Sequence, residues 1–561
     1  MSPVEVLKFG SSVLRTRDDL PVAVDEIYRH WRSGCRVLAV VSAFEGVTDQ
    51  LFKEAESLFD ADSEPATAAF VATGEQRTAE LLVAALVRCG IPARAVEPEE
   101  IRLLAQGTSL ESTPQSVDVA ALERFWRSSP ILVLPGFYGI DARGRRTLFG
   151  RGGSDMSALF LAAELGARCR LLKDVSGVFD ADPASSTCAH RFTALSWATA
   201  IEVAGPLIQA KALRYAQSRA LAFQVGRPNE SACTRVGQER DEWAAPGSNV
   251  PPLRVALLGC GVVGGGVYDL LKRYPARFTV RHVVVGDLPK YEQIDEATTD
   301  LNAALEDDID VVVECFGGVG VSYSLIAAVL DQGKYVVTAN KAVVAARWTK
   351  LVAYARGGER RLLYSATVGG VVPALETCER LRSTQAVREI RGTLNGTCGV
   401  VLDQQALGKT RDQAVALAQA GGFAEANPER DLSGEDAADK LALLIEAAFG
   451  QWLAPATIST RGIDAIPVDP KGYKLIARAR RLGQIITASV APEVVPAESF
   501  LGQARGPDNR IEIELESGEV MTLCGQGAGR WPTAVSVMGD LHEVARLGEI
   551  KHLKSRERTS P

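Results

Sequence analysis

A glycine-rich turn near the middle of the chain limits the fold more than any other feature. Gly259, Gly261 and Gly264 form a G-x-G-x-x-G motif that follows the apolar segment 253–258 and opens a helical pattern. In this setting the first glycine allows a tight turn, the second lets backbone approach a pyrophosphate, and the third allows close helix–strand packing. The segment predicts a dinucleotide-binding βαβ unit, in preference to a glycine-rich turn without a ligand. The predicted cofactor-binding residues of the turn are Gly259, Gly261, Val262, Val263 and Gly264.

Two residues after the second strand of this unit bear on the choice of cofactor. Asp287 can accept hydrogen bonds from a ribose 2′-hydroxyl, which favours NAD, whereas Lys290 can meet a 2′-phosphate, which favours NADP. The sequence therefore leaves NAD and NADP open.

Buried strands alternate with helices on both sides of a polar segment, which predicts an α/β protein with mainly parallel sheets. The polar segment 227–252 is rich in Pro, Gly and Ser and is interpreted as a linker. After residue 362 the pattern changes to antiparallel strands and amphipathic helices, which indicates an α+β domain. The predicted divisions are an α/β domain over 1–226, the linker 227–252, a Rossmann domain over 253–362, an α+β substrate domain over 363–530, and a C-terminal return over 531–561. The family resemblances described below imply that the first is an α/β sandwich and that 363–530 is a catalytic and dimerisation domain.

Composition excludes several classes of protein. The chain has 561 residues, a net charge of −7 and ten scattered cysteines without CxxC spacing. These features argue against a nucleic-acid partner, a zinc site and a disulfide framework. No signal peptide or membrane span is expected, so the predicted location is cytoplasmic.

The segment 253–545 contains a series of distinctive motifs: VVECFGG, GKYVVTANKAVVA, YSATVGGVVPALET, GTLNGTCGVVL, GGFAEANPERDLSGEDAADKLALL and GQGAGRWPTAVSVMGDL. In these motifs and in their order the segment resembles the homoserine dehydrogenase family. The resemblance implies NAD(P)-dependent interconversion of L-aspartate 4-semialdehyde and L-homoserine. It also implies that Gly317, Thr338, Asn340 and Lys341 lie at the cofactor.

One short segment gathers the residues for proton transfer. Asp436 and Lys440 are four residues apart on a predicted helix, hence on one face. From spacing alone the pair could be a solvated surface ion pair, but the surrounding motifs favour a catalytic role. The resemblance implies that Lys440 and Lys341 handle the proton, and that Glu425 and Asp431 bind the amino end of the substrate.

Two further features come from the same region. Backbone carbonyls near Val368–Val371 resemble the family's site for a monovalent cation, Na⁺ or K⁺, and Gly527–Gly529 resembles its C-terminal glycine loop. Cys398 suggests a thiol nucleophile as an alternative, but such a thiol needs a cationic partner, and no histidine lies between His282 and His542. Cys398 is therefore interpreted as a packed small residue.

The segment 4–226 contains a second series of motifs: KFGSSV, VVSAFEGVTDQL, ATGEQRTAELL, TLFGRGGSDMSALFLAAELGA and KDVSGVFDADP. In these motifs the segment resembles the amino-acid kinase family, and aspartate kinases in particular. The resemblance implies phosphorylation of L-aspartate with Mg-ATP. The implied site residues are Lys8, Gly10 and Ser42 at the phosphates, Glu75, Arg151 and Ser154 at aspartate, Asp155 as the acidic organiser, and Asp174 and Asp182 at the nucleotide.

This first segment also departs from the family's pattern. Either one glycine of the family's loop is missing or Ser11 replaces it, and a Cβ there would clash with the γ-phosphate if the backbone needed a positive φ. His190 takes the place of a nucleotide-contacting lysine. The 227–252 segment is too short for the ACT-type regulatory domains found in bifunctional relatives, so no inhibition by threonine or lysine through such a site is expected.

The two resemblances together imply a fused aspartate kinase and homoserine dehydrogenase that acts on small molecules. By analogy with both families, which commonly dimerise, the protein is expected to form a homo-oligomer, a dimer or a tetramer. One alternative is a dehydrogenase with an inactive, structural kinase-like domain. A weaker alternative is an inactive binding or regulatory subunit.

Overall fold

A computed structural model describes residues 2–60, 63–186, 188–205, 207–244, 251–356, 361–424, 427–466 and 470–557. The chain divides into two compact units. One consists of Met1–Val87, Pro92–Val250 and Ile550–Pro561, and the other of Arg88–Ile91 and Pro251–Glu549.

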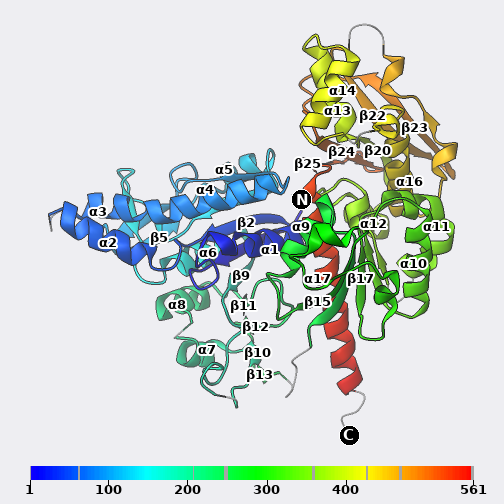
Figure 1. The fold of residues 1–561 in the computed structure, drawn as a ribbon. Helices are drawn as coiled ribbons and strands as arrows, with labels where there is room; N and C mark the ends of the chain where they lie inside the picture. The colour runs from blue at the N-terminus through cyan, green and yellow to red at the C-terminus, as the bar shows by residue number, and fades with distance from the viewer. Residues whose placement is uncertain are drawn as a thin grey trace. The chain divides into compact units, whose positions relative to one another are not determined.

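A nine-stranded sheet forms the centre of the first unit (Figure 1). Its middle strands are parallel and carry aliphatic residues buried on both faces, as expected for a sheet covered by helices on both sides. In spatial order the strands are β13 (Glu242–Trp243), β10 (Phe192–Leu195), β12 (Cys233–Val236), β11 (Phe223–Gly226), β9 (Arg168–Leu172), β1 (Val4–Phe9), β2 (Arg36–Val41), β6 (Ile131–Pro135) and β3 (Ala93–Ala95).

Within the described residues, a second, four-stranded sheet and eight α-helices complete this unit. The small sheet consists of β5 (Ser112–Ser116), β4 (Leu104–Gly107), β7 (Tyr138–Ile140) and β8 (Arg146–Leu148). The helices are α1 (Leu20–Arg32), α2 (Val47–Leu58), α3 (Glu64–Val71), α4 (Thr73–Arg88), α5 (Val119–Trp126), α6 (Gly153–Leu165), α7 (Trp197–Val203) and α8 (Ala210–Ser218).

The interpretation of 227–252 as a linker is wrong for part of that range. Strands β12 and β13 lie within it and belong to the nine-stranded sheet. The buried hydroxyl of Thr234 donates to the Phe192 carbonyl oxygen at 2.5 Å, which anchors β12 beside β10. These strands are short and carry polar residues, so they lack the apolar run that marks a buried strand. Residues 245–250 lie outside the described residues.

The second unit begins with a six-stranded parallel sheet, which confirms the predicted Rossmann-like fold. Strand order reverses beside β14, so the carboxyl ends of β14 and β17 flank the crevice where open α/β sheets bind ligands. The spatial order is β16 (Ala297–Thr298), β15 (Phe278–Val284), β14 (Leu253–Leu258), β17 (Val311–Glu314), β18 (Tyr335–Thr338) and β19 (Leu362–Leu363). The connecting helices are α9 (Val262–Leu271), α10 (Gly320–Asp331) and α11 (Lys341–Arg356).

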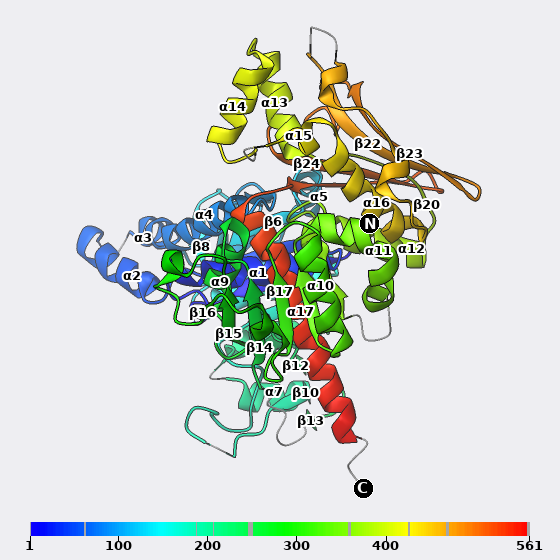
Figure 2. The same ribbon diagram turned by 45° about the vertical axis from the view of Figure 1, so that its right-hand side comes forward.

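A mixed α+β region follows, as predicted from the change of pattern after residue 362. Its mainly antiparallel sheet has the order β21 (Ser459–Thr460), β23 (Ile485–Val494), β22 (Tyr473–Leu482), β20 (Val387–Thr393), β24 (Asp508–Leu515) and β25 (Val520–Gln526). Figure 2 shows α13 and α14 side by side next to this sheet. The helices are α12 (Ala374–Thr384), α13 (Gly396–Ala406), α14 (Arg411–Ala420), α15 (Glu429–Leu432) and α16 (Glu435–Phe449).

Helix α16 is the central helix of this region. It is buried from Asp436 to Phe449 and packs against α12, α11 and β22. Left-handed glycines end it on both sides, Gly434 with φ 87° and Gly450 with φ 71°. Because its surroundings are apolar, the charged residues in its first two turns need partners close by.

The last helix, α17 (Arg530–Glu557), returns to the parallel sheet. Arg530 pairs with Asp269 of α9 at 2.6 Å, and the buried Asp540 accepts hydrogen bonds from the backbone N–H and hydroxyl of Ser365. In the described part of the chain, no helix is both long enough and apolar enough to cross a bilayer.

Candidate functional sites

The glycine turn at 259–264 has the geometry that a dinucleotide site requires. Gly259 has φ 91°, and a Cβ on Gly264 would lie 1.8 Å from the Gly259 carbonyl oxygen. A Cβ on Gly261 would meet no atom within 4 Å, so this glycine faces open space beside the N-terminus of α9. The turn can therefore admit a pyrophosphate to within contact of its backbone.

A buried carboxylate organises the neighbouring loop. Glu314, the last residue of β17, is fully buried. Its Oε2 accepts from the Thr338 hydroxyl at 2.6 Å and its Oε1 from the Asn340 amide at 3.2 Å. Its remaining donors are the Ser322 hydroxyl and the backbone N–H groups of Phe316 and Gly317. Glu314 is not among the site residues predicted from the sequence, although a charged residue at the end of a buried strand can indicate a functional position.

Through these bonds the ends of β17 and β18 are tied together. The Asn340 amide also donates to the Gly318 carbonyl oxygen at 2.7 Å. Gly317 and Gly318 have positive φ values of 83° and 73° and open space where a Cβ would lie. Thr338 and Asn340, which the resemblance assigns to the cofactor, thus hold the loop at Gly317 and Gly318, and Lys341 follows directly.

Lys341, Asp436 and Lys440 meet in one ion cluster. The Nζ of Lys341 lies 2.9 Å from Asp436 Oδ1, and the Nζ of Lys440 lies 2.7 Å from Asp436 Oδ2. Lys440 also donates to the Leu394 carbonyl oxygen at 2.8 Å. Burial by itself would raise the pKa of Asp436, but the two lysines hold it well below its usual range. The pair Asp436–Lys440 is therefore not a solvated surface pair.

The two lysines differ in their access to solvent. The Lys341 side chain is 39% exposed, whereas that of Lys440 is 9% exposed. Lys341 opens α11 of the Rossmann part and Lys440 lies on α16 of the α+β part. Asp436 therefore joins the two parts of the second unit at one point.

A second carboxylate lies beside the first. Asn395, just after β20, donates through one Nδ2 to Asp431 Oδ1 at 2.6 Å and to Asp436 Oδ2 at 2.8 Å. Burial and the charge of Asp436 raise the pKa of Asp431. Asn395 lies within the GTLNGTCGVVL motif, and the sequence did not predict a role for it.

Other predicted residues are placed as follows. Glu425 lies outside the described residues. Asp287 and Lys290 form an exposed ion pair at 2.7 Å, so each offsets the charge of the other. The fully buried Cys398 donates to the Asp431 carbonyl oxygen at 3.1 Å, and burial raises the pKa of its thiol well above the usual range. A thiol in that state is a poor nucleophile, as expected for a packed residue.

The backbone near Val368–Val371 lies against the C-terminal glycine loop. Val371 N–H donates to the Gln526 carbonyl oxygen at 3.4 Å, and a Cβ on Gly370 would lie within 3 Å of that oxygen. Gly529 has φ 123°. The two segments assigned by resemblance to the cation and to the cofactor are therefore in contact.

In the first unit a buried carboxylate also holds two lysines. Lys8 Nζ lies 2.8 Å from Asp155 Oδ1, and Lys173 Nζ lies 2.9 Å from Asp155 Oδ2. Burial lowers the pKa of Lys8 to about 8 despite the charge of Asp155. Burial opposes ionisation of Asp155, but the two lysines outweigh it and lower its pKa to about 2. Lys173 directly follows β9 and is a site residue that sequence reasoning missed.

The predicted aspartate-binding residue Glu75 is almost completely buried. Its Oε1 accepts from the Ala43 backbone N–H at 3.2 Å, while its Oε2 has no hydrogen-bond partner within the described residues. Burial raises its pKa to about 7. Ser154 is buried on α6, and Arg151 is exposed in the turn before that helix.

In the phosphate loop, Ser11 does not have the positive φ for which its Cβ was expected to clash with a phosphate. Ser11 is exposed and is not among the residues with positive φ, so its Cβ causes no backbone strain. Ser42 N–H donates to the Phe9 carbonyl oxygen at 3.1 Å, and a Cβ on Gly10 would lie 2.9 Å from Lys8 Nζ. Asp174, Asp182 and His190 are solvent-exposed or nearly so beyond β9, where a nucleotide could reach them.

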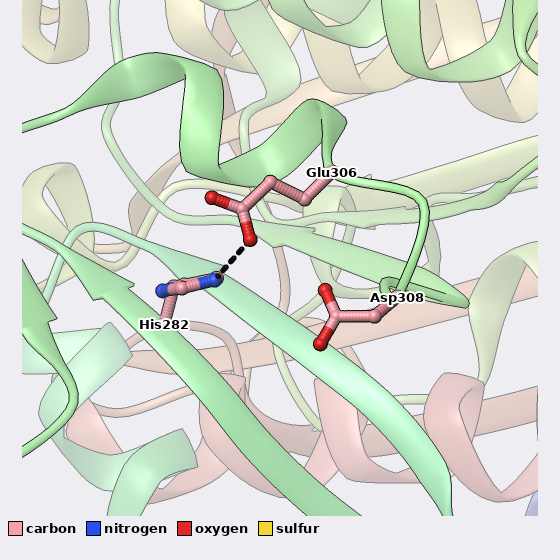
Figure 3. Close-up of side chains that lie close together, drawn as sticks. All are labelled: His282, Glu306 and Asp308. Carbon is pink, nitrogen blue, oxygen red and sulfur yellow. Dashed lines mark hydrogen bonds and ion pairs between the residues drawn. The ribbon is translucent and has the colours of Figure 1, made fainter.

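A separate group of three side chains has a metal-like composition. His282 of β15, Glu306 and Asp308 place one potential ligand atom each within 4.8 Å of one another (Figure 3). His282 Nε2 lies 3.0 Å from Glu306 Oε2, and Arg281 lies 2.7 Å from Asp308. The guanidinium neutralises one of the two carboxylates, so we assign the group to a surface ion-pair network.

Comparisons with known proteins agree with this geometry. Residues 373–542 match the family model for homoserine dehydrogenase, residues 259–365 match its NAD-binding domain, and residues 3–221 match the amino acid kinase family. The matching models include no ACT-type domain.

Individual homoserine dehydrogenases are also similar to this chain in sequence. That of Pseudomonas aeruginosa is 32% identical over 315 residues, which are 53% of this chain and 73% of that protein. That of Bacillus subtilis is 33% identical over 317 residues, 52% and 73% of the two chains. The crystal structure of a homoserine dehydrogenase from Thiobacillus denitrificans superimposes with a TM-score of 0.51 at 30% identity, over 55% of this chain and 76% of that one.

The fold and the matches define an oxidoreductase-type Rossmann protein with an added kinase-type unit. The chain belongs to the homoserine dehydrogenase family, and it carries an amino acid kinase family domain fused to its N-terminal side.

Proposed function

We propose that the second unit is a homoserine dehydrogenase that interconverts L-aspartate 4-semialdehyde and L-homoserine with NAD or NADP. The observation that carries this proposal is the ion cluster in which Asp436 pairs with both Lys341 and Lys440. Lys341 directly follows Thr338 and Asn340, which we assign to the cofactor. A nicotinamide, when bound, supplies or accepts the hydride.

The residues of the chain then handle the proton and the substrate. Lys440, fixed by Asp436 and the Leu394 carbonyl oxygen, exchanges a proton with the oxygen at the reacting carbon, and the more exposed Lys341 orients that oxygen. Asp431 binds the ammonium group of the substrate together with Glu425. A monovalent cation at the carbonyls near Val368–Val371 would stabilise the contact with the glycine loop.

For the first unit we propose a second activity, phosphorylation of the side-chain carboxylate of L-aspartate by Mg-ATP. The observation that favours it is the pair of buried lysines around Asp155, together with the unpartnered Glu75 Oε2. Phosphoryl transfer depends mainly on positioning and on charge neutralisation, which Lys8 and Lys173 supply. Gly10 and Ser42 would face the phosphates, Arg151 and Ser154 the aspartate, and Asp174 and Asp182 the nucleotide.

We also propose that the protein is cytoplasmic, forms a homo-oligomer and acts on small-molecule substrates. Reduction of the acyl phosphate between the two reactions requires a separate enzyme. Regulation by threonine through an ACT-type site is not expected, which a threonine titration of the full chain by calorimetry would test.

The decisive experiment runs two assays on one preparation of the full chain. We expect homoserine-dependent reduction of NAD⁺ or NADP⁺, and aspartate-dependent release of ADP from Mg-ATP. Running the first assay with each nucleotide establishes the cofactor preference. No nucleotide reduction would contradict the dehydrogenase. Background ADP release beside active oxidation would leave the first unit as a structural module.

A further inference from the structure

The Asn395 side chain connects the two carboxylates of the dehydrogenase site. Its Nδ2 donates to Asp431 Oδ1 at 2.6 Å and to Asp436 Oδ2 at 2.8 Å. Its Oδ1 accepts from the Cys398 N–H at 2.8 Å and so caps α13. Because the capping bond requires the oxygen on that side, the amide cannot flip, and its nitrogen must face the carboxylates.

We propose that Asn395 is a positioning residue that keeps Asp431 ionised and aimed at the ammonium group of the amino-acid substrate. This inference rests on the dehydrogenase function proposed above. It assigns to Asn395 a role in substrate binding through Asp431, without contact to the reacting atoms.

The charges around Asp431 explain why such a donor is needed. Asp431 is partly buried on α15, and the negative Asp436 of α16 faces it. The groups of opposite charge are Lys440 of α16 and Lys341 of α11, and both already pair with Asp436. The Cys398 thiol of α13 faces the Asp431 backbone. The Asn395 amide is thus the neutral donor that meets the Asp431 carboxylate directly.

Hydrogen bonds to the charged form of a carboxylate favour that form, whereas burial and like charge oppose it. Burial and Asp436 already raise the pKa of Asp431 with the amide in place. Loss of the donor would raise that pKa further, and a protonated Asp431 loses its attraction for an ammonium group.

A purely structural explanation is that Asn395 serves only as the cap of α13. Serine caps helices about as well as asparagine. Asn395→Ser therefore keeps the cap and removes the bridge. Asn395→Asp keeps the cap and replaces the donor with an additional carboxylate.

The test measures kcat and KM for homoserine oxidation from pH 5 to 9 with saturating NAD⁺ or NADP⁺. For Asn395→Ser we expect the acidic limb of the kcat/KM profile to move up by about one pH unit, because a hydrogen bond to a charged group is of that size. We also expect the KM for homoserine to rise about tenfold while kcat changes less. Asn395→Asp should move the limb at least as far.

The matched control is Thr410→Ala, which removes the capping box of the neighbouring α14 outside the site. It should lower thermal stability without moving the pH profile. A wild-type profile in a folded Asn395→Ser protein overturns the inference. Failure of both cap-retaining Asn395 variants to fold also overturns it, because the residue would then be structural. An inactive wild-type protein would instead contradict the proposed function, so the two failures are distinguishable.

Discussion

The two units each place one buried aspartate between two lysines, and the surroundings of the two clusters differ. Asp155 lies 2.8 Å from Lys8 and 2.9 Å from Lys173, and Asp436 lies 2.9 Å from Lys341 and 2.7 Å from Lys440. In the first unit both lysine side chains are less than 10% exposed. In the second unit Lys341 is 39% exposed, and a further carboxylate, Asp431, lies beside the cluster.

The two clusters differ in the net charge that they present to a ligand. Burying two lysines beside Asp155 has an electrostatic cost, because burial and the charge of Lys173 lower the pKa of Lys8 to about 8 against the opposing charges of Asp155 and Glu75. An incoming phosphate would relieve that cost. Around Asp436 the second carboxylate balances the second lysine, which suits a zwitterionic amino acid. The same three-residue pattern can therefore serve an anionic or a zwitterionic ligand, depending on one neighbour.

Replacement of Lys440 should have the largest effect. We expect Lys440→Met to reduce homoserine-dependent nucleotide reduction by about 10²–10⁴-fold, the range for loss of a general acid or base. ADP release by the first unit should be unchanged. Lys474→Met is the matched control, since Lys474 is equally buried and pairs with Asp403 at 2.9 Å outside the cluster. Equal losses in the two variants would show that the Asp436 cluster has no special role.

Replacement of Lys8 tests the other cluster. Lys8→Met should lower aspartate-dependent ADP release by about 10²–10³-fold, the usual effect of removing one group that stabilises transition-state charge. Homoserine oxidation should persist. The exposed Lys53 of α2 gives the control variant Lys53→Met.

The same cluster should respond to pH. Because burial lowers the pKa of Lys8 to about 8, affinity for Mg-ATP should fall as the pH rises through 8 and Lys8 loses its charge. A nucleotide affinity that is flat between pH 7 and 9, measured by calorimetry, would contradict the charge difference between the two clusters.

Ionisation of the buried Glu75 carboxyl should lower the stability of the first unit. Its pKa is raised from 4.5 to about 7, so the folded protein binds this proton more tightly than the unfolded chain. The associated stability is present below pH 4.5 and is lost as the pH rises through 7. Above pH 7 the free energy of unfolding of Glu75→Gln should therefore exceed that of the unchanged protein by about 3 kcal/mol. Below pH 4.5 the two proteins should be equally stable. Denaturant titration of the first unit's transition at both pH values measures this, and an unchanged stability at pH 8 would contradict it.

Ser11 should have the smallest effect. Because Ser11 has no positive φ, Ser11→Gly relieves no strain and adds freedom to the unfolded chain. We expect a loss of about 0.4–1 kcal/mol in stability and less than a threefold change in ADP release. A large gain in ADP release would show that the serine, and not the charge of the cluster, limits the first unit.

Local patterns predicted much of the fold. The apolar runs at 4–9 and 253–258 are interior strands of their sheets, and the glycine spacing at 259–264 predicted the tight turn between β14 and α9. Asp436 and Lys440 were predicted to share a helix face and are in contact. Such features depend on residues that are near one another in the chain.

The missed residues depend on distant partners. Lys173 follows β9, Glu314 ends β17 and Asn395 follows β20, and each meets groups from other strands or helices. A polar residue at the carboxyl end of a buried strand is a local signal for such positions. The strands at 233–236 and 242–243 escaped prediction because their pairing with β10 outweighs their weak local preference.

By itself the sequence predicted two nucleotide-type folds in one chain and their order, because these follow from local periodicity and motif spacing. Only the tertiary structure decided which charges share a buried site. The ionisation of Asp436, Asp431, Lys8 and Glu75 depends on burial and on neighbours brought together by folding, and no local pattern contains that information.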